Sequence, residues 1–238
     1  SAGVNGELQP LYDPCCGSGT IAIEAAQIAC HIAPGSRRRF AFEKMVPFQP
    51  HVWSAIKKEA AEAECLPPPD MPPLIYGSDV SHRMVDFAQR NAERAGVASV
   101  IEFRGGDALQ RMPPLQVQEG VGGVMLLNPP YGERIEVGGV AGSAGRGARG
   151  SQRAPVHEVP TQRAGREEAQ VEGGGEFFTQ LASHWKKNYS GWTAWMLTPD
   201  LKLPGKMRLK ETRRVPMWNG PLECRLFRFD MVAGRMKS

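Results

Sequence analysis

The sequence has no apolar run near the roughly twenty residues that a helix needs to cross a bilayer. An excess of one charge is also missing, because 29 basic and 25 acidic residues leave a net charge of +4, which permits an acidic partner without demanding one. The five cysteines form no C-x-x-C pair, and no histidine stands at zinc-ligand spacing. We therefore expect no membrane span, no metal site and a reducing intracellular compartment, either the cytoplasm or a bacterial-type organelle.

The first residues, Ser-Ala-Gly, contain neither a methionine nor an apolar signal segment. A strand near residues 9–13 already leads into a glycine-rich motif, so we interpret the chain as a piece of a longer protein. Its length and its 41% apolar content suit one domain over residues 1–238 with a sizeable core, which we expect to be monomeric.

Residues 137–175 lack leucine, isoleucine, phenylalanine, tyrosine and tryptophan, and ten of them are glycine. Such a segment cannot bury enough apolar surface to offset the entropy of ordering it. Five arginines are balanced by four glutamates, which favours a solvated spacer over an RNA-binding tail. We predict a disordered low-complexity insert within the domain.

The rest of the sequence alternates short apolar runs with amphipathic stretches, which predicts strands and helices in turn. Expected strands cover 9–13, 74–77, 99–103, 123–127, 192–197, 213–217 and 222–231, and expected helices cover 21–33, 51–64, 81–96 and 176–189. Asn219-Gly220 predicts a hairpin between the last two strands. Repeated strand-helix units indicate an α/β fold with a parallel sheet.

The stretch DPCCGSGT, Asp13 to Thr20, joins the first expected strand to the first expected helix. A phosphate-binding P-loop is disfavoured because Gly19 is followed by Thr-Ile, not Lys-Ser/Thr. A thiol site is disfavoured because no electropositive residue is near Cys15 or Cys16 in the sequence. Two interpretations remain. The stretch is either a turn in which Gly17 and Gly19 let a ligand approach the backbone closely, or an ordinary strand-helix turn.

Two acidic residues follow the next two expected strands. Asp79 closes one strand, where a carboxylate can accept both hydroxyl hydrogens of a ribose, and Asp107 follows Gly105-Gly106 after the other. Either residue alone would more often cap a helix. Together they indicate a cleft for a nucleoside-like cofactor at the carboxyl ends of the strands.

Asn128-Pro129-Pro130-Tyr131 directly follows the apolar run Val-Met-Leu-Leu. Prolines hold the backbone extended, so the Asn128 side-chain oxygen and the Pro129 carbonyl can face one donor while Tyr131 offers a ring face. This arrangement suits a planar base with an exocyclic amine, whose nitrogen could then attack a methyl group.

These motifs resemble the Rossmann-like, S-adenosylmethionine-dependent amino-methyltransferases. More narrowly, three stretches are similar to the THUMP-associated guanine-N2 methyltransferases of large-subunit ribosomal RNA: NPPYGER at 128–134, PGSRRRFAFEK at 34–44 and NGPLEC at 219–224. The resemblance implies a seven-stranded Rossmann-like sheet, mostly parallel with a C-terminal antiparallel hairpin and with helices on both faces. It covers nearly the whole chain except 137–175. We expect the RNA-binding THUMP region, which lies upstream in that family, to be absent from this piece of sequence.

The resemblance also implies roles for individual residues. The cofactor would be S-adenosylmethionine, bound by Asp13, Cys15, Gly17, Ser18, Gly19, Asp79, Asp107, Ala108 and Asn128. The target guanine would be received by the catalytic residues Asn128, Pro129 and Tyr131. The partner would be RNA, in the first place large-subunit ribosomal RNA.

Basic residues suggest a second surface. Candidate contacts to the RNA are Arg134, the cluster Arg37, Arg38 and Arg39, and the group Lys206, Arg208 and Lys210, although a solvated face is the default interpretation. The five tryptophans favour core positions over base stacking.

The predicted function is methyl transfer to the exocyclic N2 amine of a ribosomal guanine. Alternatives are an N-methyltransferase acting on transfer-RNA guanine, on adenine N6 or on a protein glutamine amide. An alternative of another class is a non-catalytic RNA-binding module that retains a vestigial cofactor fold.

Overall fold

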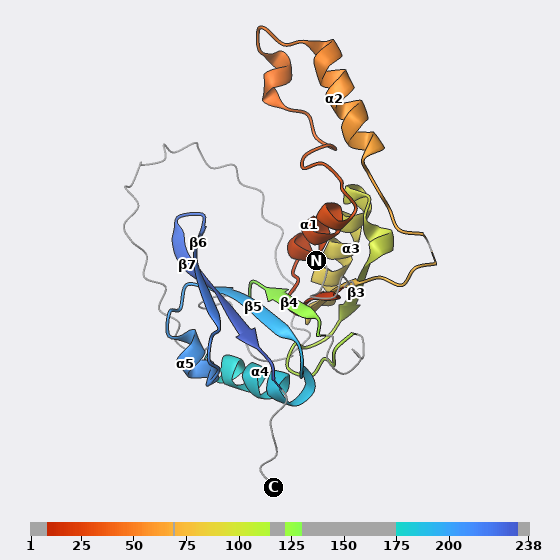
Figure 1. Ribbon diagram of the computed structural model, residues 1–238. Helices are drawn as coiled ribbons and strands as arrows, with labels where there is room; N and C mark the ends of the chain where they lie inside the picture. Colours follow the sequence, from red (N-terminus) through yellow and green to blue (C-terminus); the bar gives the residue numbers. More distant parts are fainter. Residues whose placement is uncertain (1–8, 69, 115–121, 130–174, 233–238) are drawn as a thin grey trace, which may run out of the picture.

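A computed structural model describes residues 9–68, 70–114, 122–129 and 175–232. Seven strands form one sheet in the order β3-β2-β1-β4-β5-β7-β6 (Figure 1). The strands are β1 (Leu11–Asp13), β2 (Ile75–Asp79), β3 (Ile101–Gly105), β4 (Val124–Leu127), β5 (Thr193–Thr198), β6 (Arg213–Asn219) and β7 (Leu222–Asp230). The first five pair in parallel, while β7 runs antiparallel to β5 and β6. The predicted Rossmann-like sheet with its C-terminal hairpin is confirmed.

Helices lie on both faces of this sheet (Figure 1). They are α1 (Thr20–Ala29), α2 (Pro50–Glu62), α3 (His82–Ala95), α4 (Gly175–Asn188) and α5 (Leu203–Met207), with short 3-10 turns at Ala41–Lys44 and Ala98–Val100. Helices α1 and α3 pack on the face of β1 to β3, where Ala22, Ala26 and Ala92 are fully buried. Helix α4 covers the opposite face, where Leu181 and Trp185 meet residues of β4, β5 and β7.

The predicted helix over 21–33 ends earlier than expected, at Ala29. The apolar spacing continues to Ile32, which is 4% exposed, but His31 adopts a left-handed φ of 55° and turns the chain. Ile32 therefore reaches the core from a turn and not from the helix. A similar shift of two residues affects β3, because Ala98–Val100 forms a 3-10 turn before the strand starts.

Helix α5 was not predicted from the sequence. It is only five residues long, and Pro204 stands in its first turn, a position where the missing N–H of proline costs nothing. The helix follows β5 and contacts α4. The proline-glycine pair in Leu-Pro-Gly favours a loop, which hid this short helix.

Residues between α1 and β2 form an extension that stands away from the sheet (Figure 1). Helix α2 contains no buried residue. Its Trp53 packs edge-on against Phe40 and Phe42, with ring centroids 5.7 and 5.0 Å apart. The extension is thus held by a small aromatic cluster of its own.

The tryptophans are divided between core and surface. Trp185 and Trp192 are buried as predicted, but Trp218 is 67% exposed, so the core assignment was wrong for this residue. It lies on β6, the edge strand, whose residues are mostly exposed. The predicted hairpin is confirmed, since β6 ends at Asn219, β7 starts at Leu222 and Gly220 has a left-handed φ of 61°. The insert predicted at 137–175 falls outside the described residues except for Gly175.

We expect Gly77→Ala to destabilise the fold by about 1–3 kcal/mol, because overpacking a tight site forces neighbours to move. A Cβ on Gly77 would lie 2.7 Å from the Phe103 ring and 3.2 Å from the Cys16 Cβ. The control is Gly205→Ala in α5, where a Cβ meets nothing within 4 Å and alanine favours the helix. Urea unfolding would measure both variants, and equal effects would contradict the packing argument.

Candidate active site

The glycine-rich turn after β1 is fixed by backbone hydrogen bonds to the end of β2. The Cys16 amide donates to the Ser78 carbonyl at 2.9 Å, and the Gly19 amide donates to the Cys16 carbonyl at 2.8 Å. The Asn91 side chain of α3 donates to the Ser18 carbonyl at 2.8 Å. The turn is therefore held in one shape before any ligand arrives.

The two glycines of this turn have different geometric roles. Gly17 and Gly19 adopt left-handed φ values of 52° and 85°, which other residues rarely tolerate. A Cβ on Gly19 would lie 2.9 Å from the Ala88 Cβ, whereas a Cβ on Gly17 would meet nothing within 4 Å. Gly19 thus permits close packing of α1 on α3, and Gly17 leaves open space where a ligand can approach.

The carboxylate of Asp79 joins this turn to the end of β2. One oxygen accepts the Gly17 amide at 3.0 Å, and the other accepts the Ser81 amide at 2.9 Å. Each carboxylate oxygen offers two lone pairs, so both oxygens keep capacity for ligand hydroxyls. Ser81 is the residue that precedes α3, but its side chain makes no capping hydrogen bond, and its backbone amide donates to the Asp79 carboxylate instead.

Asp107 and Ala108 follow β3 on the same edge of the sheet. The Gly106 amide donates to the Asp79 carbonyl at 3.0 Å, which ties the two strand ends together. The Asp107 carboxylate accepts the Leu109 amide at 2.9 Å, and Ala108 is buried at 8% exposure. The structure therefore brings Asp79, Asp107 and the glycine turn to one edge, as expected.

Asp13 is a buried acidic group at this edge. It is 2% exposed, and burial raises the pKa of its carboxyl to about 7, with the Cys15 amide opposing the rise and the Asp79 charge adding to it. The Cys15 amide donates to Asp13 at 3.1 Å. A buried carboxyl with this pKa can take up charge when a cation binds beside it.

The two cysteines of the turn do not form a reactive thiol site. Burial raises the pKa of Cys15 well above its ordinary value, and it raises the pKa of Cys16 as well. The carboxylates of Asp13 and Asp79 add to both shifts. Both thiols are therefore protonated at neutral pH, which supports their role as small filling side chains.

Asn128 and Pro129 follow β4, which lies next to β1 in the sheet. The parallel register pairs Leu11 with Val124 and Tyr12 with Met125, so the strands end side by side. Asn128 is exposed while Pro129 is buried. An anchored backbone thus presents Asn128 next to the glycine turn. Tyr131 and Arg134 lie outside the described residues.

The two groups of basic residues do not come together. Arg37, Arg38 and Arg39 are exposed in the connection between α1 and α2, while the other group lies in and after α5 (Figure 1). Lys206 forms an ion pair with Asp200 at 2.7 Å, and the Arg208 carbonyl accepts a bond from Lys186. Arg208 and Lys210 are exposed.

The part of the chain that the structure describes holds no group of three or more metal-ligating side chains that could bind an ion. Its helices include none that is both long and apolar enough to span a membrane.

Sequence reasoning missed several polar residues close to this edge. Tyr12 donates or accepts a 2.7 Å bond with Ser78, and Arg111 lies in the loop after Asp107. Tyr12 and Ser78 alternate with the predicted residues Asp13 and Asp79 and point to the other face of the sheet. Strand alternation alone could have placed them there, but nothing in the sequence indicated a role.

Comparisons with known proteins give relatives over most of the chain. The ribosomal RNA large subunit methyltransferase K/L of Shewanella baltica (strain OS185) is 36% identical over 215 residues, which are 90% of this chain and 25% of the relative. The homologue from Shewanella amazonensis is 34% identical with the same coverage. The chain thus spans about a quarter of the length of the curated relatives that it matches.

Solved structures show the same fold. A possible methylase from Clostridium difficile 630 is 27% identical with a TM-score of 0.70, over 96% of this chain and 50% of that one. A structure described as a predicted N6-adenine-specific DNA methylase from Listeria monocytogenes is 28% identical with a TM-score of 0.65, over 93% of this chain and 46% of that one. The family model described as the RMKL-like methyltransferase domain, UPF0020, matches residues 1–141. This chain therefore belongs to the RMKL-like methyltransferase domain family.

Proposed function

We propose that this chain transfers a methyl group from S-adenosylmethionine to the exocyclic N2 amine of a guanine in large-subunit ribosomal RNA. The observation that carries the proposal is the position of Asn128-Pro129, at the end of β4 and beside the glycine turn that Asp79 fixes. Membership of a methyltransferase domain family supports the reaction type. The name of the 36% identical relative, a ribosomal RNA large subunit methyltransferase, supports the class of substrate.

The residues at the sheet edge fit S-adenosylmethionine. Asp79 has carboxylate lone pairs left for ribose hydroxyls, the open side of Gly17 admits a ligand against backbone, and buried Ala108 offers an apolar contact for adenine. Asp13 can balance the positive charge of the methionine part. A structure of similar fold, 26% identical, was solved in complex with SAH, which supports this cofactor. When bound, the cofactor supplies a methyl group that its sulfonium makes electrophilic.

In this proposal Asn128 and Pro129 grip the target amine. Their oxygens accept the two amine hydrogens, which frees the nitrogen lone pair from the ring and directs it toward the methyl group. Tyr131 supplies a ring on which the base stacks. Because the displacement needs no covalent enzyme intermediate, these residues contribute mainly through positioning.

Contacts to the RNA beyond the target base would come from exposed residues around this edge. β7 pairs with the last residue of β5 through Arg225 and Thr198, so the hairpin tip with Trp218 extends past the carboxyl end of β5. Its 67% exposed ring can stack on an unpaired base. The exposed arginines 37–39, Arg208 and Lys210 offer phosphate contacts, together with Arg134, whereas Lys206 is already paired with Asp200.

The Asn-Pro-Pro-Tyr motif also suits adenine N6, and the Listeria neighbour is named for that chemistry. Nucleoside mass spectrometry of ribosomal RNA from cells with and without the full-length protein separates these functions. We expect the amount of N2-methylguanosine in the ribosomal RNA to fall in cells without the protein. Loss of N6-methyladenosine instead would favour the alternative, and no change in any modified nucleoside would favour a non-catalytic RNA-binding module.

Asp79→Asn should weaken binding of S-adenosylmethionine by about tenfold or more, because a hydrogen bond to a charged group contributes roughly 1.5–3 kcal/mol. Calorimetric titration of this chain measures the effect. Asp86→Asn, on the exposed face of α3, is the matched control and should bind like the parent. If Asp79→Asn also binds like the parent, the ribose assignment is wrong.

The affinity for S-adenosylmethionine should rise about tenfold between pH 5.5 and 7. The cause is Asp13, whose pKa of about 7 leaves it protonated at the lower pH and increasingly charged toward the higher one. The charged form attracts the cationic cofactor, so binding strengthens as protons leave. Calorimetry across this range should show a flat profile for Asp13→Asn, and a rise of the same size in that variant would exclude Asp13 as the cause.

In the full-length protein, Asn128→Ala should slow methyl transfer by about 10²-fold or more, equivalent to about 2.7 kcal/mol, with little change in cofactor affinity. Tyr131→Ala should also slow transfer, while Tyr131→Phe should retain much of the activity because the ring remains. Single-turnover methylation measures all three variants. Transfer near the parental rate in Asn128→Ala would refute the amine grip, and equal losses in both Tyr131 variants would assign the effect to the hydroxyl.

Trp218→Ala in the full-length protein should weaken binding of ribosomal RNA fragments by about 5- to 150-fold, because base-aromatic stacking contributes roughly 1–3 kcal/mol. Trp218→Phe keeps a stacking ring and should lose much less. RNA filter binding measures affinity, with cofactor titration as a check on folding. Unchanged RNA affinity in Trp218→Ala would show that the hairpin tip does not contribute to RNA binding.

A further inference from the structure

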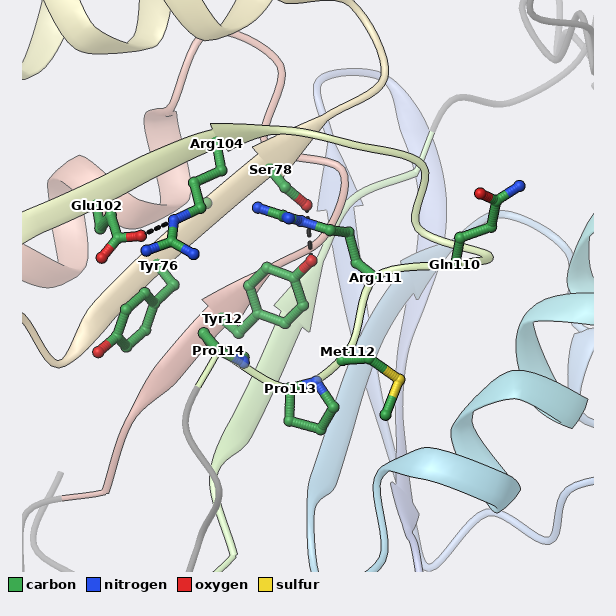
Figure 2. Close-up of a pocket in the computed structure, with 11 residues that line it drawn as sticks. Tyr12, Tyr76, Ser78, Glu102, Arg104, Gln110, Arg111, Met112, Pro113 and Pro114 are labelled. Atoms are coloured by element: carbon green, nitrogen blue, oxygen red, sulfur yellow. Dashed lines mark hydrogen bonds and ion pairs between the residues drawn. The ribbon is translucent and has the colours of Figure 1, made fainter.

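A cavity of about 310 Å³ lies on the sheet face opposite α1 and α3. Its floor is formed by side chains of β1, β2 and β3, and loop 110–114 lies over it (Figure 2). The polar side chains that line it are Tyr12, Tyr76, Ser78, Glu102, Arg104, Gln110 and Arg111. Small-molecule sites begin at about this size, so the cavity has room for a compact organic ligand.

The cavity is separate from the proposed cofactor site. Asp13, Gly17, Asp79 and Asp107 do not line it. Along β2, Tyr76 and Ser78 face the cavity, whereas a Cβ on Gly77 would point at Phe103 and Cys16 on the other face. The two sites thus share strand ends but use opposite sides of the same strands.

Arg111 is held so that its side chain crosses the end of β3. Its amide donates to the Asp107 carbonyl at 2.9 Å, and its own carbonyl accepts the Tyr189 hydroxyl at 2.9 Å and lies 2.7 Å from the His184 ring nitrogen. A Cβ on Gly106 would lie 2.7 Å from the Arg111 Cδ, so the missing Cβ provides the room for this side chain. Figure 2 shows the side chain reaching back toward the Ser78 hydroxyl.

The guanidinium of Arg111 has N–H donors that can bind a ligand. Arg104 is paired with Glu102, but among the described residues no carboxylate forms an ion pair with Arg111. A guanidinium carries five N–H donors in a planar fork that matches carboxylate and phosphate oxygens. The cavity therefore contains a positioned cation that forms no ion pair with a carboxylate of the described residues.

The hydroxyls of Tyr12 and Ser78 lie beside this guanidinium in the lining of the cavity. They are 3% and 1% exposed and share a 2.7 Å hydrogen bond. Burial raises the pKa of the Tyr12 hydroxyl despite the nearby Arg111 charge, so the phenol stays neutral and can donate.

We propose that this cavity binds a small organic anion, with a carboxylate or phosphate head on Arg111 and the Tyr12–Ser78 hydroxyl pair and an apolar body against Tyr76, Met112 and Pro113. The ring and aliphatic walls offer apolar contacts to the body, while the donors orient the head. The site goes beyond the proposed methyl transfer and does not depend on it.

The first experiment titrates the isotope-labelled chain with benzoate, phenyl phosphate and benzamide and follows backbone amide signals by NMR. The probes share one ring and differ in the head. We expect the two anions to shift the amides of Ser78 and of residues 110–112, while neutral benzamide shifts them much less. The shifts should persist with saturating S-adenosylhomocysteine, because the cofactor site lies elsewhere.

The second experiment repeats the titration with variants. Arg111→Gln should weaken binding of both anions by about tenfold or more, and Ser78→Ala should weaken it less. Arg90→Gln, an exposed arginine on α3, is the charge-matched control and should bind like the parent. Should Arg111→Gln fail to fold, Arg111→Lys tests the same contact with the charge retained and the fork lost.

Several outcomes would overturn the proposal. They are equal shifts with benzamide, unchanged affinity in Arg111→Gln, competition with S-adenosylhomocysteine, or no shift at these amides up to about 10 mM of either anion, the range of weak binding. Failure of S-adenosylhomocysteine to bind would count against the proposed cofactor and would leave the anion result standing.

Discussion

Asp79 holds together three pieces of backbone on which the site depends. Its carboxylate accepts the Gly17 amide from the turn after β1 and the Ser81 amide that precedes α3, and its backbone carbonyl accepts the Gly106 amide just after β3. Residues 62 positions apart thereby share one hydrogen bond. Because every bonded group is a backbone N–H, the contacts fix chain positions and leave the ligand-facing side of the turn clear.

Strand order then decides which residues can act together. β1 lies in the middle of the parallel part of the sheet, with β2 on one side and β4 on the other. The carboxyl ends of parallel strands lie at one edge of the sheet. Only β1, with its glycine turn, lies between Asp79 at the end of β2 and Asn128 after β4. A cofactor over the turn and a base at Asn128 would consequently face each other across β1, which is the geometry that group transfer requires.

The strands, most helices and the strand-end residues could be predicted from the sequence because each depends on local pattern. Short apolar runs indicate β4 and β5, and Asn219-Gly220 indicates the hairpin, whatever the rest of the chain does. Other features depend on contacts between distant segments. The left-handed turn at His31 that ends α1, the exposure of Trp218 on an edge strand and the position of Arg111 against Gly106 follow from packing that no local pattern encodes. Tyr131, Arg134 and the insert remain predictions.

The electrostatics of the turn explain why a glycine-rich loop of this kind favours a cationic ligand over a phosphate. In a phosphate-binding loop the amides are free to face the anion. Here the Gly17 amide is already bonded to Asp79, and a second carboxyl, Asp13, is buried close by. A phosphate in this position would meet carboxylate charge and one donor fewer. A ligand with a sulfonium and an ammonium group is instead attracted by these carboxylates. Its positive charge also lowers the free-energy cost of ionising Asp13. The same pair of acids therefore disfavours the nucleotide that the glycine spacing suggests and favours the methyl donor.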